Sequence, residues 1–458
     1  MKEANTGLLT APGNMRIARQ AVHEEGNAMQ IHVVQAGQSL YGLSQAYGIP
    51  VTDITSANEI SPNDTLVIGQ ALVIPIVGQY YWVQPGDTLT TVARKFGSTA
   101  GALASVNRIG INSVLHVGQR LYIPPAPKWR AVVNAYIDPR GTTVSPALTE
   151  SAREAAPHLT YLAPSSFRIQ RDGTIALPPL DDLGAIAQQN RTAMMMTVTN
   201  LEGDQFSAEL GQLVMNDTAL QDKLIANIVE TAKRLNYRDV HFDLEHLRPE
   251  DKEAYNRFLR KAVVPIHEAG LTMSTALAPK TSAAQQGAWY TAHDYKAHGQ
   301  IADFSIIMTY EWGYSGGPPM AVSPIGPVRK VLEYALTEMP ADKIVMGQNL
   351  YGYDWTLPYV PGGAYARAIS PQAAIGLARQ YNAQILYDYT AQAPHFSYWD
   401  NSGKEHKVWF EDARSIQAKF NLLKELRLRG ISYWKLGLSF PQNWLLLEEN
   451  FNVVKLLP

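Results

Sequence analysis

The stretch DVHFDLE, residues 239–245, holds the ionisable side chains best placed to do chemistry. Apolar and polar residues alternate in it, and successive side chains of a β-strand point to opposite faces. We therefore expect His241, Asp243 and Glu245 on one face and the apolar side chains on the other. Burying two carboxyl groups together with a histidine is unfavourable, so a functional site is the simplest reason for keeping them there.

The spacing of the two carboxyl groups favours acid catalysis. Asp243 should raise the pKa of Glu245, because two like charges cannot both ionise cheaply in a desolvated cleft. Glu245 would then hold its proton near neutral pH and could donate it to a leaving group. Taken alone, the same pattern also fits an ordinary strand end whose carboxylates are solvated or paired with Lys and Arg.

The elements that would position this strand extend over about 330 residues after the Pro-rich linker at 124–127. Strand-like runs alternate there with helical patterns such as 217–235. This order predicts an α/β fold, a (β/α)8 TIM barrel, although a doubly wound sheet would look similar locally. In a barrel, Glu245 would lie at the carboxyl-terminal mouth, where active sites are built. The eight runs begin at Arg130, Leu159, Thr192, Asp239, Leu271, Phe304, Lys343 and Gly430.

A duplicated segment precedes this region, in residues 29–76 and 80–125. Each copy begins with an alternating strand, continues through two helical patterns and ends in LVIP or LYIP, which predicts a βααβ unit. At one constant offset, Gly37, Asn58, Gly69, Gln70 and Ile74-Pro75 recur as Gly86, Asn107, Gly118, Gln119 and Ile123-Pro124.

Both copies resemble the lysin motif (LysM) family, which binds N-acetylglucosamine polymers such as peptidoglycan and chitin. The resemblance implies a shallow sugar groove between the loop after the first strand and the loop before the second. For each residue taken singly, a role in a turn or helix cap is an equal alternative. The implied glycan-binding residues are Gly37, Gln38, Ser39, Leu40, Asn58, Glu59 and Ile60, then Gly86, Asp87, Thr88, Leu89, Asn107, Arg108 and Ile109.

Strand 239–245 resembles the motif D-x-x-D-x-D-x-E of glycoside hydrolase family 18, which includes chitinases and peptidoglycan hydrolases. Asp243 and Glu245 match its last two positions. Arg238 and His241 replace its first two aspartates, which puts the buried aspartate chain of the family in question. His241 could substitute for the aspartate at its position.

Further matches extend the resemblance over residues 126–458. Met308 and Tyr310 look like the M-x-Y-D of the family, with Glu311 in place of the aspartate. Trp434 matches the tryptophan under the sugar, and residues at about 359–411 resemble a small α+β insertion between the last two strands. Met308 could instead be plain core, and Trp434 a packing residue.

The resemblance implies substrate-assisted retaining hydrolysis through an oxazolinium intermediate. Glu245 would be the acid, Asp243 and Tyr310 would hold the acetamido group, and Trp434 would stack under the sugar ring. No cofactor or metal takes part in this scheme. Further substrate contacts are expected from Met308, His241, Glu311, Trp312, Asn134, Asn200, Asn349 and Tyr351, which lie at or near expected strand ends.

The combination of domains points to one group of enzymes within this family. Two LysM repeats ahead of such a barrel, with the phrases VNAYIDP, MTYEWGYSGGPP and SYWKLGLSFPQNW, resemble the spore cortical fragment-lytic enzymes of endospore-forming bacteria. That implies an N-acetylglucosaminidase of spore-cortex peptidoglycan, located in the spore coat, cortex or cell wall. A chitinase and a catalytically impaired wall-binding protein remain the alternatives.

The composition argues against some classes of partner and gives no information on the oligomeric state. The net charge of -2 argues against a nucleic-acid partner. The absence of cysteine excludes disulfides and thiolate metal sites. No apolar run of about 18 residues predicts a membrane span. Residues 1–28 have no secretory-signal pattern, and we interpret them as a disordered arm or an upstream or cloning-derived segment.

Overall fold

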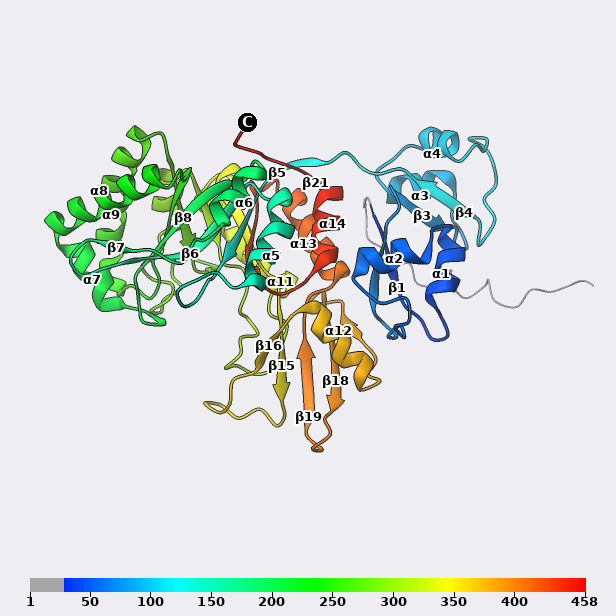
Figure 1. Cartoon of the computed structure of the whole chain (residues 1–458). Helices are drawn as coiled ribbons and strands as arrows, with labels where there is room; N and C mark the ends of the chain where they lie inside the picture. Colours follow the sequence, from blue (N-terminus) through cyan, green and yellow to red (C-terminus); the bar gives the residue numbers. More distant parts are fainter. Residues whose placement is uncertain (1–28) are drawn as a thin grey trace, which may run out of the picture. The chain divides into compact units, whose positions relative to one another are not determined.

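The computed structural model describes residues 29–458, and the chain divides into two units, one ending at Pro127 and one comprising Lys128–Pro458. The predicted arm, residues 1–28, lies outside the described residues. Figure 1 draws the first unit from blue to cyan and the second from cyan to red.

The first unit contains two copies of one βααβ arrangement, as the repeat predicts. The first copy consists of β1 (Gln30–Val33), α1 (Leu40–Tyr47), α2 (Val51–Asn58) and β2 (Ala71–Ile74). The second consists of β3 (Gln79–Trp82), α3 (Leu89–Lys95), α4 (Ala100–Val106) and β4 (Arg120–Ile123). In each copy the two strands pair antiparallel, and the helices pack on them around a small apolar core.

The second unit is built on eight parallel strands that close on themselves. The strand β5 pairs with both β6 and β20, so the sheet is a barrel and the doubly wound alternative is wrong. All eight predicted runs form barrel strands, and the predicted (β/α)8 fold is confirmed. The strands are β5 (Trp129–Ile137), β6 (Tyr161–Ile169), β8 (Ala193–Thr199), β11 (Asp239–Asp243), β12 (Thr272–Leu277), β13 (Phe304–Ile307), β14 (Ile344–Asn349) and β20 (Gly430–Trp434).

Helices and short strands surround this barrel. The helices are α5 (Pro146–Ala155), α6 (Leu183–Gln189), α7 (Ala208–Asn216), α8 (Thr218–Arg234), α9 (Lys252–Glu268), α10 (Tyr295–Ile301), α11 (Ile325–Glu338), α13 (Ala413–Glu425) and α14 (Pro441–Asn450), with 3-10 turns at Ala156–His158, Pro249–Asp251 and Ala341–Lys343. The short strands are β7 (Ile175–Ala176) beside β6, the hairpin β9 (Leu201–Glu202) and β10 (Gln205–Phe206), and β21 (Phe451–Val453) beside β5.

The alternation in β11 sorts its side chains as the sequence predicts. Phe242 points outward and meets Phe258 of α9 edge to face, with ring centroids 5.3 Å apart. His241 points inward and is fully buried, in contact with side chains of β5 and β12. The period of two therefore directs the ionisable residues of this strand into the barrel.

An insertion between β14 and β20 forms a lobe of its own, drawn from yellow to orange in Figure 1. It consists of β15 (Gly352–Thr356), β16 (Arg367–Ile369), α12 (Pro371–Gln380), β17 (Leu386–Asp388), β18 (Ala393–Trp399) and β19 (Glu405–Trp409). The strands form one antiparallel sheet in the order β16-β15-β19-β18-β17. Because β15 belongs to this sheet, the insertion begins before the expected residue 359.

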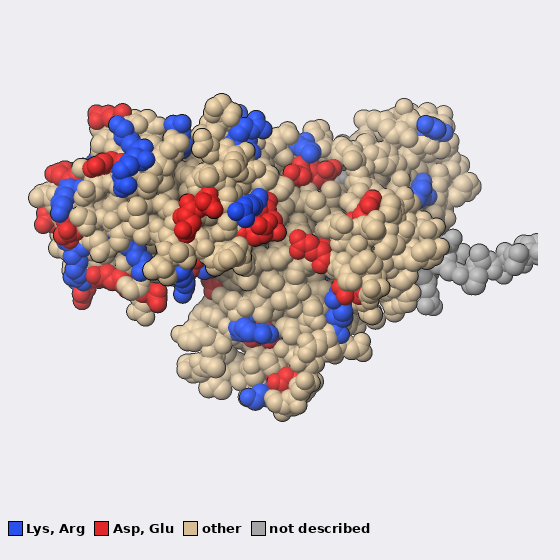
Figure 2. All heavy atoms as spheres, in the orientation of Figure 1, with Lys and Arg blue, Asp and Glu red and all other residues tan. Residues whose placement is uncertain are grey.

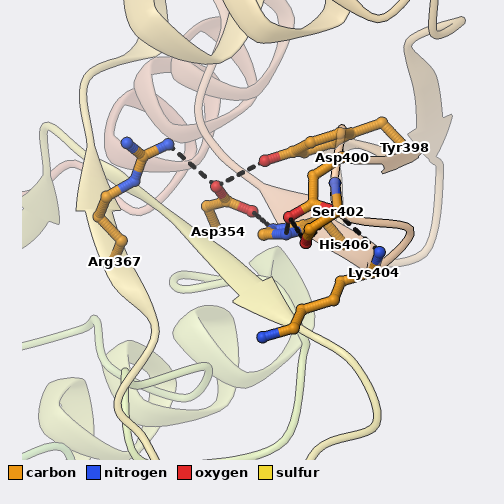
Figure 3. A network of polar contacts seen from close by, with 7 residues as sticks. All are labelled: Asp354, Arg367, Tyr398, Asp400, Ser402, Lys404 and His406. Atoms are coloured by element: carbon orange, nitrogen blue, oxygen red, sulfur yellow. Dashed lines mark hydrogen bonds and ion pairs between the residues drawn. The ribbon is translucent and has the colours of Figure 1, made fainter.

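A buried carboxylate ties the strands of this lobe together (Figure 3). Asp354 of β15 accepts hydrogen bonds from Tyr398 Oη at 2.9 Å and from His406 Nδ1 at 2.8 Å, and its other close partner is Arg367 at 3.0 Å. On its far side, His406 Nε2 faces Asp400 at 3.5 Å. The three partners of Asp354 come from β16, β18 and β19, so this carboxylate connects β15 to most of the sheet, and Asp400 of the β18–β19 turn supports His406.

On the face drawn in Figure 2, Lys and Arg are interspersed with Asp and Glu, and neither sign dominates. This agrees with the small net charge of the chain. Among residues 29–458, none of the helices is both long enough and apolar enough to cross a membrane.

Candidate active site

Glu245 lies just beyond the carboxyl end of β11, in a cleft of about 320 Å³ at the mouth of the barrel. This volume is within the usual range for small-molecule sites, about 300–1,000 Å³. Six of the side chains expected in the site line this cleft together: Glu245, Asp243, Tyr310, Trp434, Met308 and Glu311.

The environment of Glu245 favours its protonated form. Burial raises the pKa of Glu245 well above its usual range, and the charge of Asp243 raises it further. The indole N–H of Trp289 donates a hydrogen bond to Glu245, which lowers this pKa in part. Burial also raises the pKa of Asp243. Such a pair can hold a proton near neutral pH, as a general acid must.

The main chain of Glu245 is held from both sides by one buried amide. Asn200 Oδ1 accepts a hydrogen bond from the N–H of Glu245 at 3.0 Å, and Asn200 Nδ2 donates to its carbonyl oxygen at 2.9 Å. The same Nδ2 also donates to the carbonyl of Ser207 at 3.0 Å. Asn200 comes directly after β8, so it joins two neighbouring strand ends and fixes the position from which the Glu245 side chain starts.

A line of hydrogen bonds runs inward from the cleft along β11. The hydroxyl of Tyr136 is 2.7 Å from His241 Nε2, and His241 Nδ1 is 2.8 Å from Ser274 Oγ. Ser274 in turn donates to the carboxylate of Asp239 at 2.5 Å. Burial lowers the pKa of His241 to about 3 and raises the pKa of Asp239 to about 7. His241 is therefore neutral, with Nδ1–H donating to Ser274 and Nε2 accepting from Tyr136.

These hydrogen bonds show the structural role of His241 in the altered family motif. His241 occupies the position of a family aspartate, and its two ring nitrogens have partners other than Asp243. The other buried carboxyl group of β11 is Asp239, which lies two residues before His241 and deeper in the barrel. The Oδ1 atom of Asp243 is buried and has no hydrogen-bond partner among the described residues.

The segment after β13 presents Tyr310 and Glu311 to the cleft. Glu311 has a left-handed backbone, with φ of 67°, which is uncommon for a residue with a side chain. Its carboxylate accepts hydrogen bonds from the hydroxyls of Tyr351 and Tyr353. Burial raises the pKa of Glu311, while these hydrogen bonds lower it. The two tyrosines thus stabilise an otherwise costly carboxylate at the cleft.

Six residues expected to contact substrate are not among the side chains that line the cleft. Asn200 binds the main chain of Glu245, Asn134 donates to Ser432 Oγ at 2.7 Å, and Asn349 donates to the carbonyl of Tyr351 at 2.7 Å. A polar residue at a strand end can connect strands instead of facing the mouth, and spacing alone does not distinguish the two. The six are His241, Trp312, Asn134, Asn200, Asn349 and Tyr351.

Ten lining residues are missing from the sequence expectations. The strand β6 continues to Ile169, well past the start of the predicted run at Leu159. The sequence does not predict this continuation, because the polar Pro-Ser-Ser segment inside the strand looks like a turn. Trp289 comes from a loop after β12, where no periodic pattern points to the cleft. The ten are Tyr136, Asp138, Arg140, Ser165, Ser166, Arg168, Leu201, Asp204, Phe206 and Trp289.

In the LysM repeats, four of the expected glycan-binding residues serve the fold. Leu40 and Leu89 are buried in the two small cores. The Asn58 amide donates to the carbonyls of Ile54 and Val73 and accepts from the N–H of Val73, each at 2.8 Å. Asn107 makes the same three kinds of bond in the second repeat. Both asparagines thereby fasten the end of the second helix to the second strand.

The loop after the first strand is arranged alike in both repeats. Gly37 and Gly86 have φ of 79° and 86°, and Ser39 and Thr88 cap the helices that follow. Gln38 Oε1 and an Asp87 carboxylate oxygen accept hydrogen bonds that close these loops. At the other predicted loop, Glu59 and Arg108 are exposed, whereas Ile60 and Ile109 are half-buried.

Comparison with known proteins agrees with this arrangement. Residues 133–438 match the family model of glycosyl hydrolases family 18, and residues 32–75 and 81–124 each match the LysM domain. The chain is 66% identical to the cortical fragment-lytic enzyme of Bacillus subtilis over 93% of its own length and 99% of the relative.

Solved structures give the same result. The spore cortex-lytic enzyme SleL of Bacillus megaterium superposes with a TM-score of 0.87 at 53% identity, covering 94% of this chain and all of that one. A chitinase from Chromobacterium violaceum shares the fold, with a TM-score of 0.64 and 24% identity over 70% of this chain and 98% of its own. Since the family model spans most of the chain and the B. subtilis relative nearly all of it, the chain belongs to the glycosyl hydrolases of family 18, with two LysM domains ahead of the barrel.

Proposed function

We propose that this protein is a retaining N-acetylglucosaminidase that cleaves spore-cortex peptidoglycan. The observation that carries the proposal is the meeting of Glu245, Asp243, Tyr310 and Trp434 in one cleft, with the pKa of Glu245 raised by burial. Relatives named as cortical fragment-lytic and spore cortex-lytic enzymes support the choice of substrate.

The first step breaks the glycosidic bond. Glu245 donates its proton to the glycosidic oxygen, which leaves C1 with the bonding electron pair. The carbonyl oxygen of the substrate's own 2-acetamido group attacks C1 from the opposite face, and an oxazolinium ion forms. Asp243 accepts a hydrogen bond from the acetamido N–H and offsets its growing positive charge. No enzyme carboxylate bonds to the sugar.

The second step regenerates the enzyme. Glu245, now ionised, accepts a proton from a water molecule that attacks C1, and the oxazolinium ring opens. The acetamido group is restored, and the new hydroxyl lies on the face of the original glycosidic bond. The configuration at C1 is therefore retained. Tyr310 donates to the acetamido carbonyl oxygen, and Trp434 stacks beneath the ring of the bound sugar.

The hydrogen-bonded line below the cleft would hold this constellation in place. Tyr136 lines the cleft and is oriented from beneath by His241, which Ser274 and Asp239 orient in turn. A neutral histidine cannot share a proton with Asp243 as a second aspartate could. In this scheme Asp243 acts on the acetamido group alone, and Asp239 provides the buried carboxylate at the end of the line.

Product analysis tests the proposal. Cortex fragments are digested with the wild type and with Glu245→Gln, which keeps the shape of the side chain and removes the acid. Mass spectrometry after borohydride reduction should detect new N-acetylglucosamine reducing ends with the wild type only. Reducing ends on N-acetylmuramic acid would refute the assigned bond, and equal products from both proteins would refute the role of Glu245.

The LysM repeats would hold the enzyme on its insoluble substrate. Each repeat presents two loops of the expected groove, with exposed Ser39 and Glu59 in the first and Thr88 and Arg108 in the second. We assign the protein to the spore cortex or coat, since that is where this substrate and the named substrates of its relatives occur.

A further inference from the structure

One wall of the catalytic cleft carries cations that the proposed reaction does not use. Arg168 stands at the carboxyl end of β6, and Arg140 follows β5. Both line the same cleft as Glu245 and Trp434. Neither residue has a role in protonating the glycosidic oxygen or holding the acetamido group, so another reason for their presence is needed.

The guanidinium of Arg168 is largely free to bind a ligand. Its Nη1 donates to the carbonyl oxygen of Gly203 at 2.7 Å. No carboxylate of residues 29–458 lies within 4.0 Å of it, although Asp204 lines the same cleft. An arginine has five N–H donors in a planar fork that matches a carboxylate. By contrast, Arg171, outside the cleft, already pairs with Glu202 and Glu209.

Of the two arginines in this wall, Arg140 is paired with a carboxylate of residues 29–458 and Arg168 is not. Asp138 is paired with two cations, Arg140 at 3.2 Å and Lys435. One carboxylate therefore faces two positive groups. The other carboxyl groups that line the cleft are Asp204, Asp243, Glu245 and Glu311, and none of them lies within 4.0 Å of the Arg168 guanidinium. An anionic group that reaches Arg168 can form a charge-assisted pair with its guanidinium, whereas a neutral group cannot.

We propose that Arg168 binds a carboxylate of the muramic acid unit next to the cleaved N-acetylglucosamine. The inference rests on the proposed function. Peptidoglycan glycan alternates N-acetylglucosamine with N-acetylmuramic acid, so both neighbours of a bound N-acetylglucosamine carry the muramic lactyl group, whichever way the chain runs. The carboxylate is that of the lactyl group itself or belongs to a peptide attached to it. Chitin has neither, so Arg168 distinguishes the two polymers.

Four soluble tetrasaccharides test this assignment. The first is peptide-free alternating glycan with free lactyl carboxylates, and the second is the same glycan with those carboxylates converted to amides. The third carries short peptides on the lactyl groups, and the fourth is the all-N-acetylglucosamine tetramer. kcat/KM is measured for the wild type, Arg168→Gln and the matched control Arg171→Gln, which removes a cation three residues away outside the cleft.

The expected result is a loss that depends on the substrate. Arg168→Gln should lower kcat/KM about tenfold on a carboxylate-bearing glycan, the size expected for a charge-assisted pair, and leave the amidated and all-N-acetylglucosamine substrates unchanged. A loss on the first substrate identifies the lactyl carboxylate, and a loss on the third identifies the peptide. Arg171→Gln should change none of the four. Arg168→Lys should recover part of the loss, because a point charge remains without the fork.

Other outcomes overturn the inference. Equal losses on charged and neutral substrates would mean that Arg168 only supports the hairpin through Gly203. No loss on any substrate, or an equal loss with Arg171→Gln, would remove Arg168 as a specific contact. If Arg168→Gln does not fold, equal wild-type rates on all four substrates overturn the proposal by themselves. A wild type that cleaves none of the N-acetylglucosamine bonds refutes the proposed function instead.

Discussion

The substitution Asn200→Ala separates two roles for a residue that sequence analysis assigns to substrate binding. In the structure the Asn200 amide is buried and bound to the main chain of Glu245. Removing it deletes the bonds that hold the main chain of Glu245, the proposed acid, and leaves the Glu245 side chain itself intact. We therefore expect a defect in kcat rather than in KM.

The magnitude follows from the contacts that are lost. Asn200 makes three side-chain hydrogen bonds of 2.9–3.0 Å, two to Glu245 and one to Ser207. At about 1 kcal/mol each, their loss should lower the free energy of unfolding of the catalytic unit by about 3 kcal/mol. A misplacement of about 1 Å at a reacting group costs about 100-fold in rate, so kcat should fall by about that factor.

Initial-rate kinetics on a soluble cortex tetrasaccharide measure kcat and KM, and urea denaturation measures the stability. The matched control is Asn227→Ala, which removes an amide bonded to the carbonyl of Gly173 at 2.8 Å, away from the residues that line the cleft. The control should lose about 1 kcal/mol of stability and no activity. A raised KM with unchanged kcat in Asn200→Ala would refute the positioning role and restore the substrate contact.

Four further changes have defined outcomes. Trp289→Phe removes a hydrogen bond that lowers the pKa of Glu245, so the alkaline fall of kcat/KM should move to higher pH, and an unchanged or acid-shifted profile would contradict this. Asp354→Ala leaves the buried groups of Tyr398 and His406 without their acceptor and should lower stability by about 3 kcal/mol in urea; a change below about 1 kcal/mol would count against the network. Deleting residues 29–127 should weaken sedimentation with insoluble cortex and spare kcat/KM on soluble tetrasaccharides, and equal losses would oppose this division of labour. Activity should be unchanged in EDTA, because the proposed acid is a carboxyl group; a loss that zinc restores would be inconsistent with that mechanism.

The sequence predicts the elements of this protein well because their patterns are local. Strand-like runs between helical patterns identify the eight barrel strands, and the period of two in residues 239–245 also orients His241, Asp243 and Glu245 inward. The repeated segment predicts the two βααβ units in the same way. Each of these inferences needs only neighbours along the chain, since alternation and repetition are properties of short stretches.

The composition of the cleft depends on contacts that no short stretch contains. Asn200 reaches the main chain of Glu245, 45 residues away in sequence, and His241 reaches Tyr136 across 105 residues. Those pairs exist only because β8, β11 and β5 become parts of one closed barrel. The same closure determines which polar strand residues face the mouth, as Arg168 does, and which face a neighbouring strand, as Asn134 does.

Sequence alone therefore determined the strands, the repeats and the position of Glu245 at the mouth of the barrel. The tertiary structure decided that Asp239 ends the buried line behind His241, that Trp289 reaches Glu245 from a loop, and that Asn200 binds the main chain of Glu245. The physical reason is that side-chain direction along a strand is set by the backbone period, whereas a hydrogen-bond partner is set by which distant segments the fold brings within about 3 Å.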